Sequence, residues 1–214
     1  MTTLTATAAP SIKTRTLLGV LSTAGPAWIA VSLTQAATRE GFDLTRHPLS
    51  ALSTGSLGWL QITNFIVAGL LIVIGAVGLR RALADGPGAK WAPRLVAANG
   101  IGMIAAGIFT MDPGGGFPVG SPETPTTLSW HAAGHMFAGT FAFVALMAAC
   151  LVLGRVYSRA GRRGHAIASR IAGVAVIIGN AWAMSGQPGA SLGLAVGVFS
   201  GMLWVAYTAA RLRR

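Results

Sequence analysis

Two histidines, His131 and His135, stand four residues apart at the start of a long uncharged segment. On a helix this spacing places both imidazoles on one face, about one turn apart, where they can offer two nitrogens to one metal ion. Asp112 ends the preceding apolar segment, so we expect its carboxylate at the same depth. With Asp112 as the third ligand, a zinc ion would keep one position open for water and acidify that water toward neutral pH. The spacing therefore predicts a divalent metal site capable of hydrolysis.

Other interpretations of His131 and His135 stay open. At a helix start near a membrane surface, the rings can be hydrated or can hydrogen-bond neighbouring backbone carbonyl oxygens without any ligand. A metal role gains weight because ionisable groups at membrane depth are costly and usually functional. Haem iron fits less well, since two histidines four residues apart on one helix cannot occupy the two opposite axial positions.

A second group of reactive side chains begins at His47, from which His47, Ser50 and Ser53 recur every three residues. On a helical edge they would display one imidazole and two hydroxyls. Ser50 can position water or hydrogen-bond a substrate carbonyl, and His47 can take the place of the aspartate as metal ligand. Ser50 and Glu123 are the candidate catalytic residues. The alternative is that these hydroxyls only cap their own backbone.

Membrane helices must position these residues, because the composition excludes a soluble globule. Of 214 residues, 53% are hydrophobic and 10% are charged, with a mean hydropathy of +0.63, whereas soluble domains carry about 25% charged residues. A bilayer core is crossed by about 20 apolar residues, and the final uncharged stretch is long enough for two spans. We predict an all-α integral membrane protein, a bundle of six transmembrane helices. The predicted spans cover about 17–38, 57–79, 95–111, 129–154, 171–187 and 190–210.

Residues 17–210 then form a single membrane domain between a disordered cytoplasmic tail, 1–16, and a basic cytoplasmic tail, 211–214. The net charge of +11 indicates orientation rather than a nucleic-acid partner. If the six spans alternate, 14 of the 16 Lys and Arg residues lie on one side, and four of the five acids lie on the other. Basic loops stay in the cytoplasm, so we expect an N-in, C-in topology with the predicted site on the extracytoplasmic side.

Glycines recur every four residues in the last predicted span, at Gly189, Gly193, Gly197 and Gly201. Such a stripe lets another helix approach closely. We expect it to serve helix packing inside the bundle. The alternative is a homodimer, or a membrane partner protein, docked through Gly193, Gly197 and Gly201.

Six motifs spread over most of the chain are His47-Pro-Leu-Ser-Ala-Leu-Ser-Thr-Gly, Gly58-Trp-Leu-Gln, Asn64-Phe, Gly78-Leu-Arg-Arg, Phe109-Thr-Met-Asp-Pro and Ser129-Trp-His-Ala-Ala-Gly-His. In combination they resemble the DUF998 family of six-span bacterial membrane proteins, whose activity is uncharacterised. The resemblance implies a multi-pass protein of the bacterial cytoplasmic membrane and gives weight to the outer face. It implies no activity.

A weaker similarity of residue types connects the chain to membrane metallohydrolases such as alkaline ceramidases and adiponectin-type receptors. Those proteins pair a serine, an aspartate and a His-x3-His motif, which Ser50, Asp112, His131 and His135 match by type. They have seven spans, a third metal-binding histidine on an early helix, and the histidine pair on the last helix. Only the chemistry of a metal held by these residue types is taken from this similarity.

From these patterns we expect a multi-pass protein of the lipid bilayer whose outer site holds a divalent metal such as zinc. The site would bind or hydrolyse an outer-leaflet lipid or small amphiphile. Two alternatives belong to other classes. A small permease or exporter is suggested by Asn64, Asn99 and Asn180, which are polar groups within spans that can line a path. A non-catalytic partner protein would use the glycine stripe to dock another membrane protein.

Overall fold

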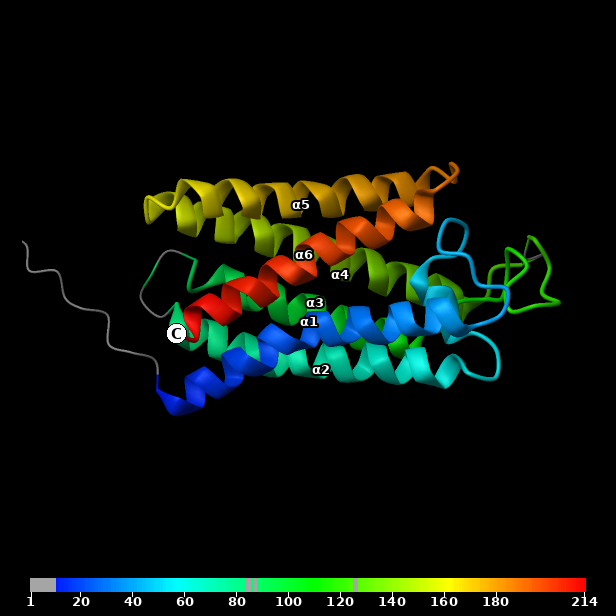
Figure 1. Cartoon of the computed structure of the whole chain (residues 1–214), viewed down its shortest axis with the longest axis horizontal. Helices are drawn as coiled ribbons and strands as arrows, with labels where there is room; N and C mark the ends of the chain where they lie inside the picture. Colours follow the sequence, from blue (N-terminus) through cyan, green and yellow to red (C-terminus); the bar gives the residue numbers. More distant parts are fainter. Residues whose placement is uncertain (1–10, 84–85, 87, 125–126) are drawn as a thin grey trace, which may run out of the picture.

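The described part of the chain folds into six long helices that run along one common axis (Figure 1). The computed structural model describes residues 11–83, 86, 88–124 and 127–214. These residues contain no β-strand, and the all-α class expected from the composition is confirmed. The elements are α1 (Ile12–Thr38), the 3-10 helix η1 (Leu49–Ser53), α2 (Gly58–Ala82), α3 (Trp91–Ile108), α4 (Trp130–Arg159), α5 (Arg163–Met184) and α6 (Ala190–Leu212).

Among the described residues, five helices are long and apolar enough to cross a membrane, so the chain is a polytopic membrane protein of a lipid bilayer. α3 is not among these five, and its 18 residues include Pro93, Arg94 and Asn99. It still packs lengthwise against α2 and α4. The count of six spans therefore stays a prediction.

The first helix begins earlier than the hydropathy predicts. Ser11 Oγ accepts a hydrogen bond from the backbone N–H of Thr14 at 3.3 Å, which caps the helix and lets it start at Ile12. Residues 12–16 are therefore helical rather than part of a disordered tail. Residues 1–10 lie outside the described part of the chain.

The helices form a closed ring. Each helix contacts its neighbours in the chain, and α6 returns to contact α1. Glycine residues let neighbouring helices approach each other closely, as predicted for the last helix. A Cβ at Gly197 would collide with the backbone of Ala175 in α5, and one at Gly193 would collide with the ring of Trp182. The glycine stripe therefore packs against other helices of the same chain. Gly197 is buried, which gives no support to a homodimer through the stripe, and the homodimer stays a prediction.

Buried polar side chains join α1 to α2 in the half of the bundle near η1. Gln61 is fully buried, and its Oε1 accepts a hydrogen bond from Gln35 Nε2 at 2.7 Å. Its Nε2 donates to Ser32 Oγ at 3.0 Å, and Asn64 Nδ2 donates to the carbonyl of Trp28 at 3.1 Å. These hydrogen bonds offset the cost of burying most of the polar atoms in an apolar environment, although Gln35 Oε1 has no partner among the described residues. Asn64 therefore serves interhelical bonding in this structure.

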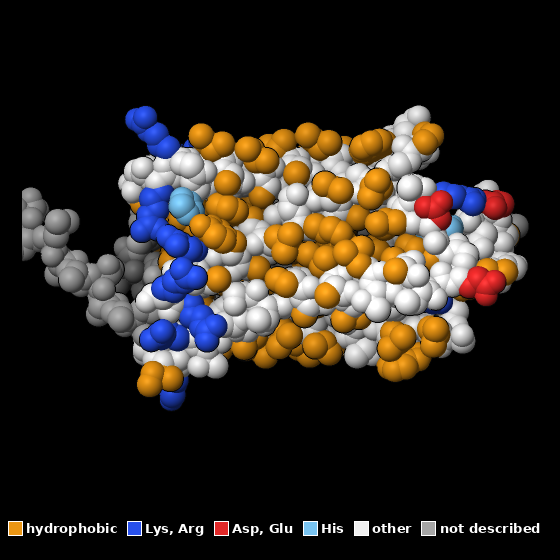
Figure 2. All heavy atoms as spheres, viewed as in Figure 1, with side chains coloured by type: hydrophobic (Ala, Val, Ile, Leu, Met, Phe, Trp, Pro, Cys, Tyr) orange, Lys and Arg blue, Asp and Glu red, His pale blue; other side chains and the backbone are white. Residues whose placement is uncertain are grey.

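The two ends of the ring differ in the charge of their side chains. Figure 2 shows most Lys and Arg side chains at the end where the chain terminates, and the acidic side chains at the opposite end. We call the first the basic end. We call the second the capped end, because residues 39–57, 109–124 and 127–129 cover it. Which end faces the cytoplasm stays a prediction.

Candidate functional site

The segment that contains η1 is held over the capped end by Arg39, which follows the last residue of α1. Its guanidinium donates to the carbonyl oxygens of Leu52 at 2.6 Å and Thr54 at 2.7 Å. The same cation lies 4.8 Å from the centre of the Phe117 ring, which belongs to the other covering segment. One arginine therefore ties together the end of α1, η1 and the segment 109–124.

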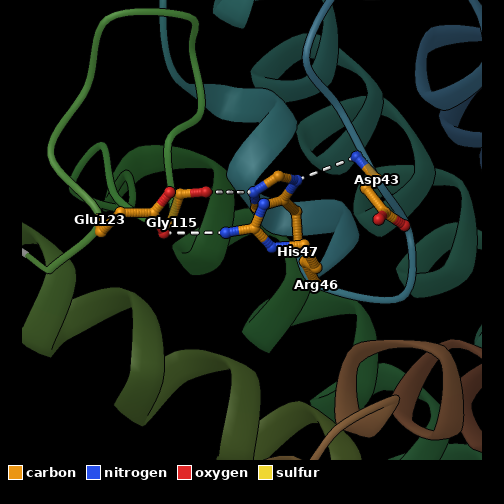
Figure 3. Close-up of polar contacts among 5 residues, drawn as sticks. All are labelled: Asp43, Arg46, His47, Gly115 and Glu123. Atoms are coloured by element: carbon orange, nitrogen blue, oxygen red, sulfur yellow. Dashed lines mark hydrogen bonds and ion pairs between the residues drawn. The ribbon is translucent and has the colours of Figure 1, made fainter.

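His47 links the same two segments through both nitrogens of its ring (Figure 3). The backbone N–H of Asp43 donates to Nδ1 at 2.9 Å, so the ring proton sits on Nε2, which donates to the Gly115 carbonyl at 2.8 Å. His47 is only 3% exposed. Beside it, Arg46 forms an exposed ion pair with Glu123 at 2.8 Å. In this arrangement both ring nitrogens of His47 have backbone partners and the Glu123 carboxylate pairs with Arg46, and the roles considered for them from the sequence stay predictions.

Asp112 organises the start of α4. Its Oδ2 accepts a hydrogen bond from the backbone N–H of Ser129 at 2.8 Å, and Ser129 Oγ accepts one from Ala132 N at 3.1 Å. These hydrogen bonds satisfy amides at the first turn of the helix. Hydrogen bonding to Ser129, together with the nearby His131, holds the pKa of Asp112 below its usual value. The carboxylate is thus a helix cap in this structure.

The two histidines of the His-x3-His motif have different surroundings. His131 is exposed and its ring lies on Trp130, with centroids 3.6 Å apart. His135 is 6% exposed, and its Nδ1 lies 2.8 Å from the Ala106 carbonyl and 2.7 Å from the Phe109 carbonyl. These carbonyls are among the last of α3, which need donors at the helix end. The backbone interpretation of the motif is therefore realised at His135.

Within the described residues, no group of three or more His, Cys, Asp or Glu side chains is arranged to hold a metal ion. His135 Nδ1 bonds α3, Asp112 caps α4, and His131 packs on an aromatic ring, so the three expected ligands have separate partners. The zinc site, with Ser50 and Glu123 as assisting residues, rests on sequence spacing alone and stays a prediction.

A cavity of about 540 Å³ occupies the capped half of the ring. All six helices contribute to its wall, which is mainly apolar and includes Trp28, Phe65 and Met103. Pro48, Leu49 and Ser50 form part of its cover. The polar side chains on the wall are Ser50, Asn99, His135, Thr140, Asn180 and Ser191.

The mouth of the cavity lies between α4 and α5, because the wall residues that are also exposed belong to these helices. They include Phe137, which is 77% exposed, and Met184, which is 68% exposed. At the middle of α5 the two helices touch, with Gly173 against Met147 and Cys150. Toward the capped end they diverge, as Figure 1 shows, since Gly179 of α5 packs on α6. The mouth therefore opens on the side of the bundle, among apolar side chains.

Sequence reasoning singled out His135 and Ser50 but not the cavity that they line. Asn99 and Asn180, considered as groups along a path, also lie on its wall. Trp28, also on the wall, is 5% exposed, and its Nε1 has no hydrogen-bond partner among the described residues. The signal available in the sequence was the recurrence of polar residues in the capped halves of several apolar segments.

The model of the family described as "Protein of unknown function (DUF998)" matches residues 22–211. The chain belongs to the DUF998 family. No curated protein and no solved structure gives a significant match. The matched range includes every residue of the cavity wall, from Trp28 to Met202, so the cavity lies within the region that defines this DUF998 protein as a family member.

Proposed function

We propose that this DUF998 protein binds a membrane amphiphile in the cavity of the helix ring. The observation that carries the proposal is the lateral mouth between α4 and α5, rimmed by the exposed Phe137 and Met184. An apolar chain can pass from the bilayer into the cavity through this mouth without crossing water. The volume of about 540 Å³ is typical of sites for small molecules, which measure roughly 300–1,000 Å³.

The positive-inside rule supports an orientation with the basic end in the cytoplasm. With that orientation the mouth faces the outer leaflet, and the ligand is an outer-leaflet lipid or a related amphiphile of a bacterial cytoplasmic membrane. Binding is favoured over hydrolysis as the primary activity. The hydroxyl of Ser50 makes no hydrogen bond to a described base, and Glu123 pairs with Arg46 outside the cavity.

Photolabelling tests the proposal. The protein is reconstituted in lipid vesicles with a long-chain alkyl probe that carries a diazirine, and the labelled residues are mapped by mass spectrometry. We expect label on residues of the cavity wall. Thr140→Trp places a large ring at the mouth and should lower this labelling toward background, because Thr140 is both exposed and on the wall.

Val144→Trp is the matched control, since Val144 lies one turn further along the same helix, is exposed and does not line the cavity. It should leave the labelling unchanged. Label confined to the outer surface of the bundle, or an equal response to both variants, would contradict binding in the cavity.

Transport is a second candidate, favoured by a small space beneath the cavity floor. Asn99 and Met202 line both spaces, and the lower one continues toward the basic end between Ile72 and Leu146. In a Cys150→Ala background, a cysteine at Met202 would then react with water-soluble reagents added from either side of the membrane. Reaction from one side only would contradict a through path.

A further inference from the structure

The polar wall of the cavity has a definite hydrogen-bonding character, which is fixed by His135. Both contacts of its Nδ1 are to carbonyl oxygens, of Ala106 and Phe109, and a carbonyl oxygen can only accept. Nδ1 must therefore carry the proton of the neutral ring. Nε2 is then left with a lone pair and is a hydrogen-bond acceptor.

This acceptor belongs to a side chain that lines the cavity. Nε2 of His135 has no hydrogen-bond partner among the described residues, and it is not among the atoms sealed from the surroundings. The ring lies on the cavity wall, edge-on to Phe65 with the ring centroids 5.9 Å apart. An acceptor in such apolar surroundings is left unsatisfied unless the occupant of the cavity donates to it.

Asn99 adds a second acceptor on the same wall. Its Nδ2 donates to the Ala142 carbonyl at 3.1 Å, which settles the orientation of the amide because only the nitrogen can donate. Its Oδ1 makes no hydrogen bond to a described residue. No Lys, Arg, Asp or Glu is found among the residues described on the wall. A charged head group would therefore enter without a counter-charge, at a high desolvation cost.

We infer that the cavity selects a neutral long-chain amphiphile whose hydroxyl donates a hydrogen bond to Nε2 of His135. The inference rests on the proposed function and adds the chemical class of the ligand. An ester, an ether or a carboxylate offers only acceptors to Nε2, whereas a hydroxyl supplies the missing donor. The alkyl chain of the ligand lies against the apolar wall and leaves through the mouth between α4 and α5.

Competition against the diazirine probe tests this class. Hexadecanol and its methyl ether share the chain and differ in the single O–H donor. Leaving the buried Nε2 unpaired should make the ether roughly 5- to 150-fold weaker as a competitor. Palmitate at about pH 8, where it is a carboxylate, should also compete less well than hexadecanol. Equal competition by alcohol and ether overturns the inference but leaves cavity binding intact, whereas failure of all three to compete overturns both.

A pair of variants tests whether His135 is the side chain that prefers a ligand with an O–H donor. Asparagine at position 135 can still donate to the carbonyls at the end of α3 but lacks the distant nitrogen. His135→Asn should therefore erase the preference for alcohol over ether. His131→Asn, at an exposed histidine off the cavity wall, should keep it. A folded His135→Asn variant that still prefers the alcohol over the ether would refute the assignment. If that variant does not fold, the comparison of alcohol with ether on the native protein tests the inference.

Discussion

Replacing His47 by phenylalanine measures how strongly the ring nitrogens hold the capped end together. The phenyl ring keeps the aromatic contacts with Phe42 and Phe117 but removes the acceptor for Asp43 N–H and the donor to the Gly115 carbonyl. Asp43 is exposed, so water can replace its lost partner, and we count one unpaired buried group. That loss costs about 1–3 kcal/mol. Local opening of the covering segments should therefore become roughly 5- to 150-fold more frequent.

Amide hydrogen exchange by mass spectrometry reads out this opening. The relevant amides are hydrogen-bonded within the covering segments, such as Thr54 N to the Ala51 carbonyl and Phe117 N to the Gly114 carbonyl. Their exchange should accelerate while that of the helix centres stays slow. His165→Phe, at a half-buried histidine of the basic end, is the control and should leave the capped end unaffected. Unchanged exchange in His47→Phe, or acceleration spread evenly over the bundle, would refute the reasoning.

Three further predictions concern packing, charge and metal. Gly197→Leu should prevent α5 and α6 from packing and abolish folded protein in detergent, whereas Gly164→Leu, where a Cβ meets open space, should be tolerated; equal size-exclusion profiles would contradict this. Because the folded-state pKa of Asp112 is lowered, its stabilisation is present above its unfolded pKa and is lost as pH falls through the folded value. Asp112→Asn should therefore weaken the acid dependence of thermal unfolding, and identical pH profiles would count against a cap. If the zinc hypothesis holds, purified native protein should contain zinc that the His131→Ala/His135→Ala double variant lacks; equal, negligible zinc in both would end it.

The helices could be predicted because each is set by a local property of the sequence. Long uncharged segments can satisfy their backbone groups in a bilayer only as helices, and charged or turn-forming residues interrupt them. The glycine spacing of α6 likewise follows from one helical period. The boundary that differs from the prediction lies where a single side chain outweighs hydropathy, since Ser11 extends α1 by capping it.

The candidate site was harder to predict because its hydrogen bonds join residues far apart in sequence. The spacing of His131 and His135 indicates that they share a helix, but not that Nδ1 of His135 reaches the end of α3. Similarly, nothing local to His47 indicates that Gly115 is its partner. The cavity arises from the divergence of two helices, which depends on the residues that each helix packs against elsewhere.

The hydrogen-bonded contact between α1 and α2 has a mechanical consequence for the ring. Gln61 joins these two helices with side-chain hydrogen bonds in the capped half of the ring, the half in which α4 and α5 separate. One side of the ring is therefore stiff, and the side that bears the mouth is compliant. A change in lateral pressure within the bilayer would be taken up mainly by α4 and α5, so membrane composition would tune the width of the mouth before it altered any other part of the bundle.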